Sequence, residues 1–185
     1  RKRGSALIYT TQYHSPVGEL FLAAKDDALI GLWMQGQKYY LGSLREAKTK
    51  QSDHPVLQEA AAWLDRYFAG EKPLISELKL EPMGSEFRQT VWQALCEIPY
   101  GELTTYGELS QKIAARLGKQ QISAQAVGGA IGHNAISIII PCHRVVGATG
   151  SLTGYAGGID KKLQLLKHEG VNMDRLFVPA KSTAP

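Results

Sequence analysis

One cysteine, Cys142, has neighbours that favour chemistry over simple packing. It follows an apolar run at residues 136–140 and then Pro141. Because proline fixes its own φ and favours an extended residue before it, we expect the run to be a buried, strand-like segment. Such a segment would present Cys142 at a defined turn.

Two residues that can carry positive charge, His143 and Arg144, follow Cys142 directly. A free thiol titrates near pH ~8.5, and a neighbouring positive charge lowers its pKa and raises the reactive thiolate fraction. The other cysteine, Cys96, lies in an amphipathic helical pattern, where cysteine usually packs as a small hydrophobe. The sequence therefore predicts Cys142 as a nucleophile and Cys96 as a core residue.

Composition is typical of a globular protein. With 185 residues, 44% of them hydrophobic, the chain can bury a core as one medium domain or two small ones. No apolar stretch approaches the ~20 residues of a membrane span, and the basic residues 1–3 are not followed by the apolar core of a signal peptide. Two cysteines without a CxxC pair fit a reducing compartment. We expect a soluble, cytoplasmic protein with no membrane partner.

Neither the histidines nor the glycines form a cofactor-binding pattern. The histidines, at positions 14, 54, 133, 143 and 168, lack the spacing of metal ligands. A glycine-rich stretch at 147–158 lacks the Lys-Ser/Thr ending of a phosphate-binding loop. We expect no metal and no cofactor, and we predict that the stretch lines a pocket or groove.

Positive charge is concentrated around Cys142. The formal net charge is +4, and no acidic residue lies between Glu108 and Asp160. The basic residues in this window are Lys112, Arg116, Lys119 and Arg144. Solvated lysines on a modestly basic protein would give the same net charge, but their position beside the nucleophile favours a nucleic-acid-binding face.

The first part of the chain predicts a small antiparallel sheet with one helix. Turn-forming residues separate three short strands, at 6–13, 19–24 and 28–34. Apolar residues at helical spacing predict a helix over 55–68, closed by Gly70. Prolines and glycine in 71–85 disfavour both helix and central strand, so we place a domain boundary near residue 80.

The second part predicts a mostly helical domain. Helices are expected at 86–97, 105–117 and 123–132. Ser85 and Thr105 are suitable N-caps, and Glu108 completes a capping box with Thr105. The short connection between the last two helices predicts a helix-turn-helix. Asp160 is expected to cap a final helix, and the chain from 172 onward to be loosely held.

The predicted helix at 123–132 contains interior glycines, each of which costs about 1 kcal/mol relative to alanine. Small residues allow a close approach of another backbone, and that partner could be a neighbouring helix or DNA. Asn134 follows the helix. Since asparagine tolerates turn geometry and bonds local backbone, Asn134 could brace the loop that carries Cys142.

Taken together, these motifs resemble a known family. They are Pro141-Cys142-His143-Arg144-Val145-Val146-Gly147, Ala126-Val127-Gly128-Gly129-Ala130 with Asn134, Gly154-Tyr155 with Gly157-Gly158, and His168-Glu169-Gly170. The set resembles the methylated-DNA-protein-cysteine methyltransferases, the O6-alkylguanine-DNA alkyltransferases, over about residues 85–170. The hairpin start at 15–18 is similar to the family's variable N-terminal domain.

This resemblance implies an α/β (α+β) protein with a small N-terminal antiparallel sheet and helix. The implied divisions are a ribonuclease-H-like domain at 1–80, a helical domain of winged-helix or helix-turn-helix type at 81–172 that carries the cysteine, and a tail at 173–185. The implied partner is double-stranded DNA that contains O6-alkylguanine, bound by a monomer; O4-alkylthymine is a second candidate substrate. The nucleotide would be flipped out of the stack.

The resemblance also implies roles for individual residues. Cys142 would accept the alkyl group irreversibly. His143 would deprotonate the Cys142 thiol through a water, and Glu169 would orient His143. Tyr106 would protonate the guanine leaving group and help to rotate the lesion's phosphate, and Asn134 would hold the active-site turn.

Further residues would bind the substrate. Those expected to line the guanine pocket are Val145, Tyr155, Ala156 and Gly157. Those expected to contact DNA are Ser123, Ala124, Gln125, Ala126, Gly128 and Arg144.

Gln125 departs from the family pattern. The family usually carries an arginine finger here that fills the vacated base stack. Glutamine can hydrogen-bond to the orphaned base, but it brings no charge and less stacking area. We expect weaker duplex binding or flipping with the chemistry retained. The zinc ligands of some members' N-terminal domains are also absent, because that segment has no cysteine.

Two other functions fit parts of the pattern. A sensor that binds alkylated guanine and recruits excision repair would resemble the alkyltransferase-like proteins, but those typically lack the acceptor cysteine. A cysteine hydrolase would use Cys142 and His143 on an acyl substrate. Adjacent side chains on an extended segment diverge, which disfavours direct proton transfer between them.

Overall fold

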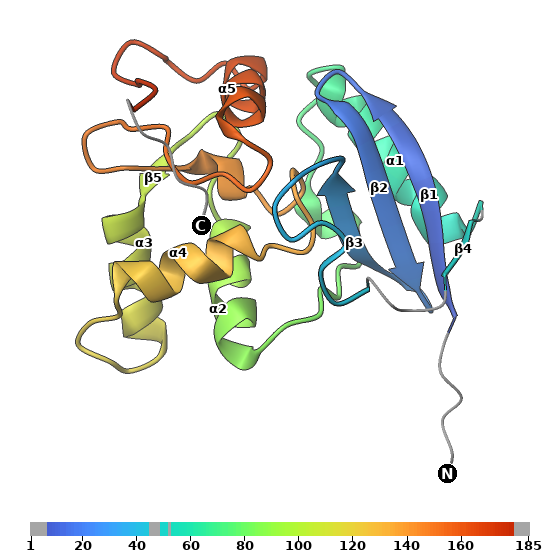
Figure 1. Cartoon of the computed structure of the whole chain (residues 1–185), viewed down its shortest axis with the longest axis horizontal. Helices are drawn as coiled ribbons and strands as arrows, with labels where there is room; N and C mark the ends of the chain where they lie inside the picture. The colour runs from blue at the N-terminus through green and yellow to red at the C-terminus, as the bar shows by residue number, and fades with distance from the viewer. Residues whose placement is uncertain (1–6, 45–48, 52, 180–185) are drawn as a thin grey trace.

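A computed structural model describes residues 7–44, 49–51 and 53–179 of the chain. A sheet with helix α1 is followed by a helical half that contains α2 to α5, as Figure 1 shows. The predicted α+β class is confirmed. Three predicted features lie outside the described residues: the basic start at 1–3, the first strand residue Ala6 and the tail end at 180–185.

The N-terminal sheet has the strand order β3-β2-β1-β4. Its members are β1 (Ile8–Ser15), β2 (Gly18–Lys25), β3 (Ala28–Met34) and β4 (Thr49–Gln51). The first three are antiparallel, as predicted, and β4 pairs in parallel with β1. The sequence did not predict β4, since three residues show no periodicity. Helix α1 (Pro55–Phe68) lies behind β1 and β2 in Figure 1 and buries a face that includes Leu57, Ala60 and Leu64.

Strand β3 connects the sheet to the helical half. All seven of its residues are buried. Its outer edge is occupied, because the N–H of Leu32 donates to the carbonyl of Ala135 (2.8 Å) and the N–H of Ser137 donates back to Leu32 (2.9 Å). The segment that leads to Cys142 is therefore held against the sheet by main-chain hydrogen bonds.

This segment is buried as predicted, but it is not a strand. Only Ile136 forms a bridge, with Leu32, and residues 137–140 turn. The N–H of Ile140 donates to the carbonyl of Ile136 (3.0 Å), and Ile138 has a φ of +71°. A positive φ is unusual for a β-branched residue, so the surrounding contacts must impose it. An unbroken apolar run does not distinguish a buried strand from a buried turn.

The helical half begins with α2 (Glu86–Leu95), α3 (Tyr106–Arg116) and α4 (Ala124–Gly132). The side chains of Ser85, Thr105 and Ser123 accept hydrogen bonds from backbone N–H groups in the first turns of α2, α3 and α4. The carboxylate of Glu108 contacts the hydroxyl of Thr105. As the short connection predicted, α3 and α4 form a helix-turn-helix. The buried indole of Trp92 on α2 donates to the carbonyl of Ala130 (2.8 Å) and fixes α2 against α4.

Two expectations about the C-terminal part are corrected. Helix α5 (Ile159–His168) begins after Gly158, whose φ of +95° suits glycine, so Asp160 lies inside the first turn and is not the cap. The start of the tail is tied down, because the N–H of Leu152 donates to the carbonyl of Phe177 (2.9 Å) and the N–H of Phe177 donates to Gly150 (3.1 Å). The short parallel strands β5 (Thr104–Thr105) and β6 (Val145–Val146) complete this half.

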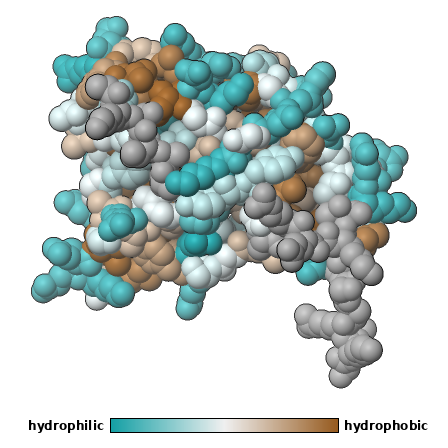
Figure 2. Space-filling view, in the orientation of Figure 1, coloured by the Kyte–Doolittle hydropathy of each residue, from teal (hydrophilic) through white to brown (hydrophobic). Residues whose placement is uncertain are grey.

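A small apolar cluster under α5 includes Val146, Leu152 and Leu166. Partly buried side chains of Leu103, Ile159, Leu163, Met173 and Leu176 pack against it. Figure 2 shows hydrophobic side chains at the surface near α5, at the upper left of that view. Among the described residues, no helix combines the length and apolarity needed to cross a membrane.

Candidate active site

Cys142 begins a 3₁₀ turn, Cys142–Arg144, directly after Pro141. Its side chain is buried, with 4% of the residue exposed, and its N–H donates to the carbonyl of Ile140 (2.8 Å). The thiol therefore has a fixed position, as the proline context predicted, although the mount is a turn and not the end of a strand.

Asn134 connects the thiol to the turn that precedes it. Its amide nitrogen Nδ2 donates to the Sγ atom of Cys142 (3.2 Å) and to the carbonyl of Ile140 (2.8 Å). Its Oδ1 atom accepts from the N–H of Ile136 (3.0 Å). Three contacts from one buried side chain span the segment between Ile136 and Cys142, which is the geometry of a brace.

The electrostatics of the thiol differ from those predicted. Burial raises the pKa of Cys142, and the opposing contributions come from the Asn134 hydrogen bond and the Lys162 charge. We expected His143 and Arg144 to lower this pKa, but both side chains are directed to Glu169. The prediction failed because adjacency in sequence does not set the direction of a side chain.

Lys162 was missed by the sequence analysis. It lies on α5, is 0% exposed, and its ammonium donates to the carbonyls of Val145 (2.5 Å) and Thr153 (2.9 Å). Burial lowers its pKa to about 8, opposed by the charge of a Cys142 thiolate. A signal was present in the sequence, because Lys162 precedes the buried Leu165 and Leu166 by three and four residues and so shares their helix face.

His143 and Glu169 form a buried pair. The Nε2 atom of His143 lies 2.6 Å from Oε2 of Glu169, and both side chains are 0% exposed. The Nδ1 atom of His143 is buried and has no hydrogen-bond partner among the described residues. If Nε2 carries the proton, Nδ1 has a free lone pair and can accept a proton from another group.

Burial lowers the pKa of His143, and the charge and hydrogen bond of Glu169 oppose that change. Burial alone would raise the pKa of Glu169, but the hydrogen bonds and charges of His143 and Arg144 hold it well below its usual value. Both directions favour a neutral imidazole beside a carboxylate.

Arg144 does not lie on a DNA-facing surface, which corrects its predicted role. Its side chain is 7% exposed. Its Nε donates to Oε1 of Glu169 (2.8 Å), and its other nitrogens donate to the carbonyl of Ile98 (2.6 Å) and to Oε2 of Glu169 (3.1 Å). A buried guanidinium whose three nitrogens all donate within the protein is not placed to bind a phosphate at the surface.

Of the predicted guanine-pocket residues, Tyr155 lies close enough to Cys142 for the thiolate charge to raise its pKa. Val145 and Tyr155 are buried, and the Tyr155 hydroxyl has no partner among the described residues. The carbonyl of Ala156 accepts from the N–H of Lys38 (2.9 Å). A Cβ at Gly157 would lie 2.6 Å from the sulfur of Met34, so this position requires glycine.

Tyr106 lies close enough to Cys142 for the two groups to interact electrostatically. Its hydroxyl donates towards the carbonyls of Thr153 and Gly154, both at 3.2 Å, and burial, followed by the charge of Cys142, raises its pKa. A hollow of about 490 Å³ adjoins it, lined by Tyr106, Ala124, Gln125, Gly128, Gly129, Thr153 and Gly154. The glycine-rich stretch thus lines a groove together with α4, as predicted.

The face of α4 that borders the hollow is open. Ser123, Ala124, Gln125 and Ala126 are exposed. A Cβ at Gly128 or at Gly129 would meet nothing within 4 Å outside the helix's own backbone. Packing against a neighbouring helix therefore does not explain these glycines, and the alternative of close approach to DNA remains.

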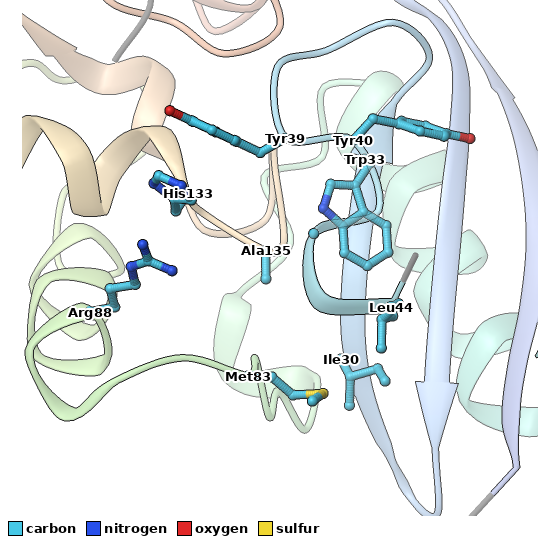
Figure 3. A pocket seen from close by; sticks show the side chains of 10 residues that line it. Ile30, Trp33, Tyr39, Tyr40, Leu44, Met83, Arg88, His133 and Ala135 are labelled. Atoms are coloured by element: carbon cyan, nitrogen blue, oxygen red, sulfur yellow. The ribbon is translucent and has the colours of Figure 1, made fainter. Parts of the chain in front are cut away.

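A second hollow, of about 250 Å³, lies between the sheet and the helical half and is shown in Figure 3. Tyr39 stacks on His133 there, with ring centroids 3.7 Å apart, and Trp33, Met83 and Arg88 complete much of the wall. Neither Cys142 nor the His143–Glu169 pair lines it. Its stacked pair attaches the end of α4 to the N-terminal part of the chain.

Two helices joined by a short connection, beside a buried thiol that accepts an amide hydrogen bond, are the combination expected of a DNA-binding protein with a reactive cysteine. The profile described as "6-O-methylguanine DNA methyltransferase, DNA binding domain" matches residues 86–171. The profile described as "6-O-methylguanine DNA methyltransferase, ribonuclease-like domain" matches residues 8–82. The chain belongs to the 6-O-methylguanine DNA methyltransferase family.

Relatives support this assignment along most of the chain. A methylated-DNA–protein-cysteine methyltransferase of Haemophilus influenzae is 41% identical over 164 residues, covering 89% of this chain and 87% of that protein. One from Methanosarcina acetivorans is 43% identical, and the match covers 88% of this chain and 99% of that protein. The crystal structure of Mycobacterium tuberculosis OGT in complex with DNA has a TM-score of 0.71 at 41% identity. The match covers 88% of this chain and 92% of that chain.

Replacing Asn134 with alanine tests the brace. The substitution removes the donor to Sγ, so the pKa of Cys142 should rise further. It also leaves the Ile136 N–H without its acceptor, while the carbonyl of Ile140 keeps the hydrogen bond from the N–H of Cys142. We expect a loss of about 1–3 kcal/mol in unfolding free energy. We also expect the midpoint of Cys142 alkylation by iodoacetamide to move to higher pH, measured in a Cys96→Ala background.

The matched control is Asn172→Ala, since the Oδ1 of Asn172 accepts only a local backbone bond from Asp174 (3.0 Å) at the surface. It should change neither measurement. An unchanged alkylation midpoint in Asn134→Ala would show that the amide does not stabilise the thiolate.

Proposed function

We propose that this protein repairs DNA by transferring an alkyl group from the O6 atom of guanine to Cys142. The observation that carries the proposal is the fixed, buried Sγ atom, which accepts a hydrogen bond from Asn134 and directly precedes the His143–Glu169 pair. Tyr106, which feels the charge of Cys142, lines the hollow beside α4. The relatives' names give methylated DNA as the donor and a protein cysteine as the acceptor.

The reaction is a single displacement. The thiol proton leaves to Nδ1 of His143 through a water, and Glu169 stabilises the imidazolium that forms. The Sγ thiolate attacks the alkyl carbon, the S–C bond forms, and the C–O6 bond breaks with its electron pair going to the guanine. Tyr106 gives the guanine a proton and recovers one from His143. The net products are an S-alkylcysteine and a normal guanine, so each protein molecule acts once.

The charge of Lys162 favours the thiolate during this step. The ammonium lies within electrostatic reach of Cys142 and lowers its pKa, while burial raises it. In a site that excludes water such a charge acts strongly. Lys162 also holds the carbonyls of Val145 and Thr153, which keeps the pocket wall and the opening in place.

Access to the buried thiol requires the nucleotide to leave the duplex. Unstacking costs a few kcal/mol, which contacts in the pocket offset. We assign the pocket to Val145, Tyr155, Ala156 and Gly157, and the duplex contacts to Ser123, Ala124, Gln125, Ala126 and Gly128. In this assignment the helical domain at 81–172 binds DNA, and the N-terminal domain at 1–80 supports it. The open glycine face of α4 allows the close approach that minor-groove binding needs.

We further propose that the protein acts as a monomer in the cytoplasm. Both cysteines are free, and a thiol that must react once has to be kept reduced until it meets its substrate. The alternative of a sensor that only binds alkylated guanine is not favoured, because Cys142 is present in a braced position and the sensor proteins resembled here typically lack it.

Intact mass measurement tests the chemistry. After incubation with duplex DNA that contains O6-methylguanine, the protein should gain the mass of one methyl group. Cys142→Ala should gain none, and Cys96→Ala is the matched control that should still gain one. Binding without any gain in mass by the unaltered protein would favour the sensor.

The substitution Gln125→Arg tests the account of duplex opening. An arginine adds a charge and a larger stacking surface, a contact worth on the order of 1–3 kcal/mol. We expect transfer from duplex DNA to become about tenfold faster, with no gain on single-stranded DNA. Gln111→Arg, at an exposed position on α3, adds the same charge as a control. An equal gain in both variants, or none on duplex, would contradict the account.

The substitution Gly128→Ala separates folding from DNA binding. Because a Cβ at Gly128 meets nothing in the protein, alanine should raise the unfolding free energy by up to about 1 kcal/mol. The added methyl should weaken duplex binding if this backbone approaches DNA closely. Urea denaturation and duplex titration measure the two effects. If the variant is more stable and binds duplex DNA equally well, the backbone of α4 at Gly128 does not approach DNA closely.

A further inference from the structure

One residue of the N-terminal part, Tyr67, reaches the buried pair beside the nucleophile. It lies near the end of α1, 102 positions before Glu169, and its hydroxyl donates to the Oε2 atom of Glu169 at 2.5 Å. This is the same oxygen that accepts from His143. The length is typical of a hydroxyl that donates to a charged carboxylate.

Tyr67 is itself held rigidly. It is 1% exposed, its ring stacks on Trp63 with centroids 5.6 Å apart, and Phe68 and Tyr100 meet it edge to face. Its backbone carbonyl lies 2.8 Å from Nε2 of His168, the residue before Glu169. The ends of α1 and α5 are thus joined by two hydrogen bonds that involve consecutive residues of α5's C-terminal end.

The carboxylate of Glu169 has a full set of donors. Oε2 accepts from Tyr67, His143 and Arg144, and Oε1 accepts from Arg144 and from the N–H of Gly101 (3.1 Å). Burial and the neighbouring Glu169 charge raise the pKa of Tyr67, so it remains a neutral donor. Each donor fixes the orientation of the carboxylate and reduces its affinity for a proton.

We propose that Tyr67 is a positioning residue for alkyl transfer: its hydroxyl holds Oε2 of Glu169 so that the carboxylate orients His143 without taking or over-stabilising its proton. This inference rests on the proposed roles of Cys142, His143 and Glu169. It gives the N-terminal part of the chain a direct effect on the chemistry, transmitted through one hydrogen bond.

Several charged or titratable groups surround the His143–Glu169 pair, and the substitution Tyr67→Phe leaves all of them in place. They are Cys142, Arg144, Lys162 and Glu169, with Tyr100 and Tyr155 within electrostatic reach of the carboxylate and His168 packed on the ring of Tyr67. A shift in the pH dependence that follows the loss of the Tyr67 hydroxyl alone is therefore assigned to its hydrogen bond with Glu169.

The test is Tyr67→Phe, which keeps the stacked ring and removes the hydroxyl. Without this donor Glu169 holds a proton on His143 more strongly, so the pKa of His143 rises and less neutral imidazole is available as a base. We expect single-turnover methyl transfer at neutral pH to slow by on the order of tenfold, and the acid limb of the rate profile to move to higher pH.

The chain offers a matched control in Tyr13→Phe. The Tyr13 hydroxyl also donates to a carboxylate of α1, Oδ1 of Asp65 (2.6 Å), but at an exposed site outside the nucleophile's surroundings. This variant should leave the rate and its pH profile unchanged. Urea denaturation of both variants shows how much of any effect comes from stability.

A double substitution identifies the route. If Tyr67 acts through Glu169, Tyr67→Phe should have little further effect on the rate in a Glu169→Gln background. Two outcomes would overturn the inference and leave the proposed function intact. One is that Tyr67→Phe slows transfer as much in the Glu169→Gln background as it does alone. The other is that Glu169→Gln slows transfer while Tyr67→Phe has the same rate and pH profile as Tyr13→Phe. If Glu169→Gln does not slow transfer, both the relay and the inference fail.

Discussion

A single buried carboxylate, that of Glu169, is the charge on which the arrangement of the site depends. It ties together four separate parts of the chain: α1 through Tyr67, the turn before β5 through Gly101, the 3₁₀ turn after Cys142 and the end of α5. Burying a charge is costly unless it is paired and hydrogen-bonded, and here each oxygen has more than one donor. Removing any one donor would leave the others to rearrange around an incompletely satisfied charge.

The same carboxylate explains why a basic residue beside the cysteine does not bind DNA. Arg144 balances the buried negative charge, and so the His143 imidazole can stay neutral. Thiolate stabilisation comes instead from across the site, from Asn134 and Lys162. One set of groups orients the His143 imidazole, and another lies near the Cys142 sulfur. The pKa values of the imidazole and of the thiol can therefore be adjusted separately.

Much of this fold could be predicted from local patterns. The hairpin, α1 and the capped helices follow from periodicity and from side chains such as Ser85 and Thr105, which act within a few residues of their own position. Asn134 was predicted as a brace because its partner is eight residues away and its type suits a turn. The cysteine stood out by its proline and histidine neighbours.

The rest depended on contacts that local patterns do not encode. In the sequence Lys162 looks no different from the adjacent Lys161, which is only half-buried, and it is distinguished by the carbonyls of Val145 and Thr153 that its ammonium binds. Tyr67 has the spacing of an ordinary core residue of α1, and its partner lies 102 positions away. The turn at 137–140 is imposed by Asn134 and by β3, since its apolar residues alone would also suit a strand.

The position of α5 late in the chain has a consequence for biosynthesis. During translation Cys142 leaves the ribosome before Lys162 and Glu169 do, and domains generally fold in the order in which they emerge. Until α5 docks, the cysteine lacks both its neighbouring ammonium and the carboxylate that orients His143. A nascent chain therefore carries a thiol without a neighbouring ammonium or an oriented imidazole. The complete site forms only when the long-range contacts of α1 and α5 close together, a step that topology makes slower than helix formation.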